Sequence, residues 1–140
     1  MAKKGKLIQN GVHLQEHEYK SVKFFLDQGI DVELIPRSKV HNLRMPDISM
    51  NGVVWEVKAP IGDGKNNAQN TMKKAKDQSR NIIIDLQRCK MNDDRAVKEF
   101  EREFLKLKHL KRLKIIKKMA KRLTLKDDAR IMMVQGVGLH

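Results

Sequence analysis

Residues 44–58 read RMPDISMNGVVWEVK, and this stretch decides how the chain folds. Asn51-Gly52 stands between two short apolar runs, which is the strongest local signal for a β-hairpin with a two-residue turn. Side chains alternate between the two faces of a strand. Glu56 and Lys58 therefore share one face of the second strand, while Trp55 and Val57 share the other. Opposite charges on an otherwise apolar strand are costly if they are buried without partners, so this face is a candidate functional site.

The hairpin also brings a third polar side chain to the same place. Asp47 follows Pro46 at the start of the first strand and can reach Glu56 and Lys58 across the hairpin. Two converging carboxylates supply the hard oxygen ligands that Mg²⁺ or Mn²⁺ prefers. A neighbouring lysine can orient a nucleophilic water or stabilise developing negative charge. The alternative is a solvated polar face on an edge hairpin.

The bulk composition favours a polyanionic partner. A chain of 140 residues is long enough for one domain, residues 1–140, with a single modest core. It carries 30 Lys and Arg residues against 17 Asp and Glu, a net charge of +13. This imbalance points to nucleic acid before a membrane surface.

Several classes of protein are excluded by the same composition. The chain has no apolar run long enough to span a membrane, and its basic first residues lack the apolar core of a signal peptide. The single cysteine, Cys89, excludes internal disulfides and cysteine-based zinc sites. Aromatic residues make up only 4% of the chain, which argues against a base-stacking platform for single strands.

The N-terminal part of the chain predicts an arm, a helix and a strand. Residues 1–12 are basic and polar, typical of a flexible arm. Apolar residues recur at helical spacing between His13 and Gln28, and Gly29 is a plausible end of that helix. Alternating apolar residues over 31–36 predict a strand.

The part that follows the hairpin predicts a crossover between parallel strands. Pro60 ends the Glu56 strand, and a glycine-rich loop leads to a helix that extends to about Ser79. The β-branched run NIIIDL at 81–86 predicts a buried central strand. A parallel pairing of this strand with the Glu56 strand would form a right-handed βαβ unit.

Residues 93–126 form a basic segment that is predicted to be helical. Apolar residues hold a 3–4 period, although the pattern leaves open one helix, two helices, or a strand over Arg112–Ile116. Residues 106–126 contain ten Lys and Arg side chains and no acidic one. Residues 130–135 predict a last short strand.

Basic and amide side chains outside the hairpin are candidates for binding the phosphate backbone. On the helix before the buried strand, the alternative is an ordinary solvated face. The predicted nucleic-acid-binding residues are Lys65, Asn66, Lys73, Lys74, Lys76, Gln78, Arg80, Lys111, Arg112, Lys114, Lys117 and Lys118.

Pro46-Asp47 followed by Glu56-x-Lys58 across a hairpin resembles the PD-(D/E)xK, or restriction-endonuclease-like, nuclease superfamily. The predicted order of elements, α-β-β-β-α-β followed by the basic segment and a last strand, fits the mixed α/β (α+β) sheet of that fold. In the superfamily a glutamate on the first helix often completes the metal site. The resemblance assigns this role to Glu18, with Glu16 as its competitor.

A closer resemblance spans roughly residues 14–90. The runs GVVWEVKAP at 52–60, GKN at 64–66 and AKDQSRNIIIDL at 75–86 look like the C-terminal tRNA-nuclease toxin domains of contact-dependent growth inhibition proteins. This likeness implies a metal-dependent ribonuclease with catalytic residues Glu18, Asp47, Glu56 and Lys58. It also implies a cognate immunity protein as partner and action in the cytoplasm of a target cell.

Two other functions remain open at this point. A DNA endonuclease of the same fold, from a restriction, phage or mobile element, would show the same motif. A non-catalytic basic nucleic-acid-binding protein would use the segment after residue 93 and would need none of the hairpin residues.

Overall fold

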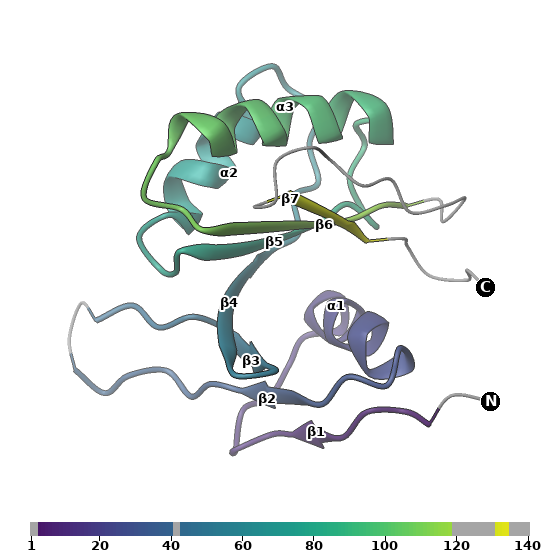
Figure 1. Ribbon diagram of the computed structural model, residues 1–140, viewed down its shortest axis with the longest axis vertical. Helices are drawn as coiled ribbons and strands as arrows, with labels where there is room; N and C mark the ends of the chain where they lie inside the picture. The colour runs from purple at the N-terminus through teal and green to yellow at the C-terminus, as the bar shows by residue number, and fades with distance from the viewer. Residues whose placement is uncertain (1–2, 41–42, 119–130, 135–140) are drawn as a thin grey trace.

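A computed structural model describes residues 3–40, 43–118 and 131–134 (Figure 1). Within these residues, seven strands form one sheet in which each strand neighbours the next along the chain. Three helices of the described part cover the sheet. The elements in chain order are β1 (Leu7–Ile8), α1 (Glu16–Asp27), β2 (Val32–Leu34), β3 (Ile48–Met50), β4 (Val53–Lys58), α2 (Asn67–Ala75), β5 (Asn81–Asp85), α3 (Asp93–Lys106), β6 (Arg112–Ile116) and β7 (Ile131–Val134).

The sheet is mixed, and β4 is the strand that joins its two parts. β2, β3 and β4 are antiparallel neighbours, whereas β4, β5, β6 and β7 are all parallel. β1 adds to β2 in parallel. Figure 1 shows β4 as a long bent strand that connects β1–β3 and α1 with β5–β7, α2 and α3. The predicted mixed α+β fold and the parallel pairing across α2 are confirmed.

The predicted hairpin is present with the predicted turn. Ile48 pairs with Trp55 and Met50 with Val53, so only Asn51 and Gly52 form the loop. Both turn residues have positive φ, 50° and 78°. This is the type I′ combination that matches the right-handed twist of two strands, and Asn-Gly adopts it at the lowest cost.

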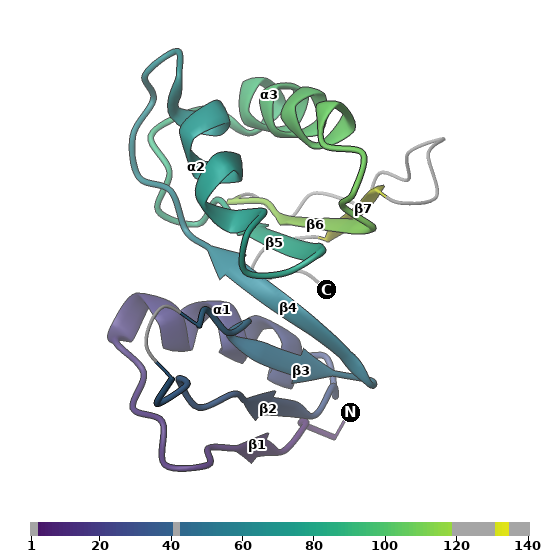
Figure 2. The ribbon, with the colours of Figure 1, turned by 90° about the vertical axis from the view of Figure 1, so that its left-hand side faces the viewer.

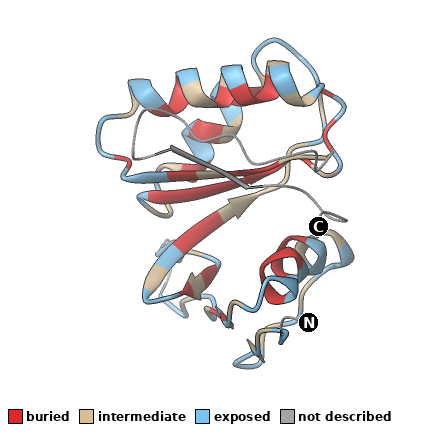
Figure 3. Cartoon of the chain, turned by 45° about the vertical axis from the view of Figure 1, so that its right-hand side comes forward, coloured by how far each residue is buried: buried red, intermediate tan, exposed pale blue. Residues whose placement is uncertain are grey.

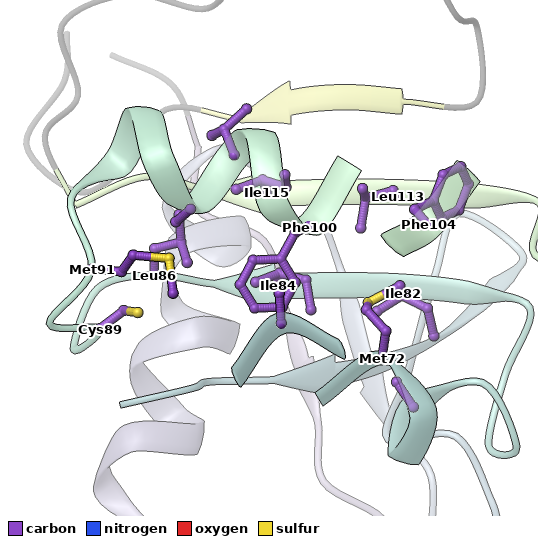
Figure 4. Close-up of a cluster of buried hydrophobic side chains, with 14 of the residues drawn as sticks. Met72, Ile82, Ile84, Leu86, Cys89, Met91, Phe100, Phe104, Leu113 and Ile115 are labelled. Carbon is purple, nitrogen blue, oxygen red and sulfur yellow. The ribbon is translucent and has the colours of Figure 1, made fainter. Parts of the chain in front are cut away.

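Two apolar clusters lie on opposite faces of the sheet. α2 and α3 pack on one face, where Phe100 and Phe104 cover Ile82, Ile84 and their neighbours (Figure 4). α1 packs on the other face through Phe25 with Trp55 and Ile83. Successive residues of β5 thus serve different clusters, which explains why all of its side chains are buried and its sequence is a continuous apolar run.

The helices are amphipathic and short. Figure 3 shows the buried residues of α3 on one side of the helix and exposed ones on the other. α3, at 14 residues, is the longest described helix. Among the described residues, no helix combines the length and apolar character needed to cross a membrane.

The predicted flexible arm over residues 1–12 is wrong in part. Leu7 and Ile8 form β1. Just before it, the Lys6 backbone N–H donates a 2.8 Å hydrogen bond to Asp31 Oδ1. The Gly5 N–H donates to the carbonyl of Leu26 at 2.8 Å. The strand was not predicted because a two-residue strand is too short to show alternating apolar and polar side chains. Its hydrogen bonds are made by the backbone, which the basic side chains around it do not indicate.

The predicted helix over residues 93–126 is also wrong beyond its first half. α3 ends at Lys106, and β6 occupies 112–116. Leu113 and Ile115 face α3, while Ile116 faces the α1 cluster, so β6 is apolar on both faces and its pattern resembles that of a helix. Of the open alternatives, the strand over Arg112–Ile116 is correct. Residues 119–126 lie outside the described residues, and the predicted last strand is confirmed as β7.

Candidate active site

The antiparallel pairing of β3 with β4 places Asp47 beside the end of β4. The Asp47 N–H donates to the Trp55 carbonyl at 3.0 Å. Further along β4, the Asp47 side chain takes the place of a backbone acceptor, because its Oδ2 accepts a 2.9 Å hydrogen bond from the Val57 N–H. Asp47 thus lies directly before β3, and its side chain is fixed against the backbone of β4.

Glu56 and Lys58 lie on the same face of β4, as the alternation predicts. The Lys58 ammonium lies 3.1 Å from Glu56 Oε2 and donates to Gln78 Oε1, also at 3.1 Å. Gln78 follows α2 along the chain, so the crossover after β4 supplies the third member of this contact. The structure therefore brings together Asp47, Glu56, Lys58 and Gln78.

The Glu56 carboxyl group is buried without a full set of partners. Only 2% of the residue is exposed, and Oε1 is a buried oxygen with no hydrogen-bond partner. Burial, and secondly the adjacent Asp47 carboxylate, raise the pKa of Glu56 from 4.5 to about 8, although Lys58 acts in the opposite direction. A carboxyl group in this environment gains either a proton or a cation at near-neutral pH.

Asp47 and Glu56 fit a hard divalent cation, but Glu18 does not complete a set of three ligands. The unpartnered Oε1 and the neighbouring Asp47 carboxylate are the oxygen donors that Mg²⁺ or Mn²⁺ takes. Among the described residues no group of three or more His, Cys, Asp or Glu side chains is close enough to hold a metal ion. Glu18 instead accepts a 2.8 Å hydrogen bond from the Gln15 N–H in the capping box of α1.

Glu18 nevertheless faces the same cavity as Asp47. A cavity of about 720 Å³ is lined by α1, by the segment between β2 and β3, and by Asp47 and Gln78. Glu16, the competing residue, is exposed, pairs with Lys20 at 4.0 Å and does not line this cavity. Of the two glutamates, Glu18 alone lines the cavity, and its role at a metal site stays a prediction.

The predicted phosphate-binding residues fall into three groups. Lys65, Asn66, Lys73 and Lys74 are exposed on α2 or just before it. Arg80, Lys111 and Arg112 are exposed and adjacent, since the Lys111 N–H donates to the Arg80 carbonyl at 2.7 Å. Lys76 and Lys117 are half-buried. None of these lines the cavity; of the predicted set, only Gln78 does.

Lys114 and Lys118 have structural contacts that the sequence did not predict. Lys114 lies over the rings of Phe25 and Trp55, 5.5 and 4.9 Å from their centroids, and burial lowers its pKa. Lys118 Nζ donates to the carbonyls of Cys89 and Met91 at 2.8 and 2.6 Å. Lys114 on β6 and Lys118 just after it thus have contacts within the protein, and their role as phosphate-binding residues stays a prediction.

A buried polar cluster next to the cavity was missed. Asp85, at the end of β5, accepts hydrogen bonds from the Ser21 hydroxyl and from both the N–H and side-chain amide of Gln87. Ser21 lines the cavity. The sequence contained a signal for this cluster. An aspartate at the end of a β-branched run indicates a buried charge that needs hydrogen-bond partners.

Comparison with known proteins agrees with the geometry. The sequence model of the contact-dependent growth inhibition CdiA C-terminal domain matches residues 44–122, more than half of the chain and all of the β3–β6 region. The chain belongs to this family. In this CdiA C-terminal domain the matched region contains Asp47, Glu56, Lys58 and Gln78. No curated protein matches the sequence.

A solved structure supports the same fold for this CdiA C-terminal domain. A chain of the CdiA-CT/CdiI toxin and immunity complex from Burkholderia pseudomallei superposes with a TM-score of 0.58 at 18% sequence identity. The match covers 81% of this chain and 93% of that one. At this identity the likeness establishes the fold.

Proposed function

We propose that this CdiA C-terminal domain is a toxin nuclease that uses a PD-(D/E)xK site and a divalent metal ion to cleave tRNA. CdiA C-terminal toxin domains are typically nucleases. The observation that carries the proposal is the buried Glu56 carboxyl group, held between Asp47 and Lys58 with one oxygen unpartnered. The choice of tRNA rests on the sequence likeness of residues 52–86 to tRNA-nuclease toxin domains.

Asp47 and Glu56 would hold Mg²⁺ or Mn²⁺. When bound between such carboxylates, the ion polarises a phosphoryl oxygen and lowers the pKa of a coordinated water. Glu56 must lose its proton for this, and its raised pKa means that cation binding displaces a proton near neutral pH. Asp47 is already fixed by the Val57 N–H and needs no reorganisation.

Lys58 is the residue that meets the developing charge. Its ammonium is held at the end of β4 by Glu56 and Gln78, so its position is set before substrate arrives. A preorganised cation stabilises the extra negative charge of a phosphorane-like transition state without a cost of reorganisation. Gln78 is a positioning residue, because it acts through Lys58.

A cognate immunity protein is proposed as the partner, with the target-cell cytoplasm as the place of action. The Burkholderia pseudomallei relative was solved as a toxin and immunity complex. A nuclease directed at tRNA harms any cell that contains it, so its producer needs a specific inhibitor. Co-purification of this chain with the product of the adjacent reading frame would test the partnership.

The test of the function is a substrate panel. Purified protein is incubated with total tRNA and separately with plasmid DNA, in Mg²⁺, in Mn²⁺ and in EDTA, with Glu56→Ala alongside. The proposal expects discrete tRNA fragments in either metal and none in EDTA or with the variant. DNA nicking would keep the site and change the substrate. Salt-sensitive binding without any cleavage would indicate the non-catalytic alternative.

A further inference from the structure

The cavity next to Asp47 has the dimensions of a site for one nucleotide. Its volume of about 720 Å³ lies inside the range of roughly 300–1,000 Å³ that small-molecule sites occupy. Asp47 and Gln78 both line the cavity, so a ligand in it lies beside the proposed cleavage site. The segment that connects β2 with β3 (Figure 2) contributes residues to the lining of this cavity, as does α1.

The lining carries three cations that have no acidic partner among the described residues. Arg37, Lys39 and Arg44 line the cavity and are exposed. Within residues 3–40 and 43–118, no ion pair involves any of them. Elsewhere on this surface lysines and arginines do pair, as Lys23 does with Asp27 at 2.7 Å. Unpaired cations converging on a cavity suit a ligand that brings its own negative charge.

The same lining carries apolar side chains that face solvent. Val40 and Leu43 also line the cavity and are 65% and 53% exposed, more than any other large hydrophobic residue described. Leu14 and Met45 extend this apolar surface into the cavity. An apolar face next to phosphate-binding cations matches the two chemical parts of a nucleotide, a flat base and a charged backbone.

We propose that this cavity binds one unpaired nucleotide of the substrate, adjacent to the bond that is cut. The base would lie against Val40, Leu43 and Met45, and Arg37, Lys39 and Arg44 would bind the flanking phosphates. A base inside a duplex cannot reach such a cavity unless it leaves the stack. The inference rests on the proposed nuclease function and adds that the strand must be single-stranded at the site of cleavage.

The experiment measures binding without catalysis, so that it stands apart from the test of the function. Fluorescence anisotropy in EDTA gives the affinity of the protein for a 12-nucleotide single-stranded RNA and for the blunt duplex of the same sequence. A gel confirms that the RNA stays intact. Two triple variants remove the same charge: Arg37→Gln/Lys39→Gln/Arg44→Gln in the cavity wall, and Lys73→Gln/Lys74→Gln/Lys111→Gln on exposed positions outside it.

The proposal expects the wild type to bind the single strand about tenfold more tightly than the duplex. The cavity-wall variant should lose this preference, and its salt slope for single strands should fall by about 2, as three lost phosphate contacts require. The control variant should bind the single strand and the duplex more weakly by the same factor, so it should keep the preference for the single strand. Equal wild-type affinity for the two ligands, or the same loss of preference in both variants, would overturn the proposal.

An apolar pair of variants tests the base-binding wall in the same assay. Val40→Ser/Leu43→Ser removes apolar surface in the cavity, and Ile61→Ser/Leu105→Ser removes exposed apolar surface elsewhere. The first should lower single-strand affinity severalfold and leave duplex affinity unchanged, whereas the second should change neither. A cavity variant that binds the single strand as the wild type does would contradict the base contact.

Discussion

Glu56 lowers the stability of the folded protein in its ionised form, and the same buried carboxylate is suited to bind a cation. A buried carboxyl group with an unpartnered oxygen destabilises a metal-free protein once it is ionised, yet the chain places one on its central hairpin. Lys58 offsets part of this cost, and Asp47 increases it. An arrangement that is unfavourable for stability and suited to a cation is typical of a functional site.

Glu56 should make the metal-free protein less stable as pH rises. Its pKa is about 8 in the folded state and 4.5 when unperturbed, so between these values the folded protein holds a proton that the unfolded chain has lost. The stabilisation is complete below pH 4.5 and disappears as pH rises through 8. Urea unfolding in EDTA at pH 5.5 and at pH 9 measures this effect. Between the two pH values, the free energy of unfolding should fall by about 3–4 kcal/mol more for the wild type than for Glu56→Gln. Parallel pH curves for the two proteins would contradict this environment for Glu56.

Lys114 shows how a basic residue can be recruited for packing. Its methylene stem crosses the α1 face of the sheet, and its ammonium lies over Trp55 and Phe25. Burial lowers the pKa of Lys114, because it disfavours the charged form. The two rings lie where they attract that charge.

Lys114→Met should therefore leave nucleic-acid binding unchanged. The substitution keeps the apolar stem. We therefore expect the free energy of unfolding to fall by no more than about 1 kcal/mol, or to rise, relative to the wild type. Loss of a true phosphate contact would weaken binding and reduce the salt slope by about 1. Anisotropy titrations at three salt concentrations, with Lys39→Met as the matched cavity variant, measure the difference. A reduced slope for Lys114→Met would restore it to the phosphate-binding surface.

At the scale of elements, the β3–β4 hairpin fixes the geometry of the site. The two-residue turn sets the register, and the register places Asp47 next to Val57 and hence beside Glu56. A shift by one residue would move Glu56 to the α1 face and Trp55 into the site. The turn thus sets the geometry of the proposed active site, although it lies at the far end of the strands.

Gly52→Ala tests the turn. Gly52 has φ of 78°, and a Cβ there would meet no atom within 4 Å, so the cost is that of the backbone conformation alone. We expect a loss of about 1–2 kcal/mol in urea unfolding with cleavage activity retained in the folded fraction. As control, Gly64→Ala also meets open space but lacks a positive φ, and it should cost less. Equal costs at the two positions would contradict the type I′ turn.

The elements with a strong local pattern were predictable, and those defined by context were not. Asn51-Gly52, the periodic apolar residues of α1 and the run at 81–85 each carry their own signal. β6 does not, because a strand buried on both faces repeats apolar residues without strict alternation, and its basic neighbours resemble a solvated helix. β1 consists of two residues whose pairing with β2 depends on backbone contacts far apart in the sequence.

At the scale of the whole molecule, net charge predicts a polyanionic partner but does not predict where on the surface that partner would bind. Asp47, Glu56, Lys58 and Gln78 were predicted from the hairpin and the resemblance, and the structure brings them together. The cavity wall of Arg37, Lys39 and Arg44 was missed, because only the tertiary fold shows that this loop faces the site. The buried pair Ser21 and Asp85 was also missed, although an aspartate at the end of a β-branched run indicates a buried charge.

The measurement that tests the central claim most directly compares binding with cleavage in Glu56→Gln. The substitution keeps the shape of the side chain and removes the charge that would hold a metal, so the protein should remain folded. We expect tRNA affinity within about twofold of wild type and a single-turnover cleavage rate in Mg²⁺ at least 10²-fold lower, in the range reported for loss of one key catalytic group. Cleavage at the wild-type rate by a folded Glu56→Gln protein would contradict the account, because the hairpin site would then have no part in the chemistry.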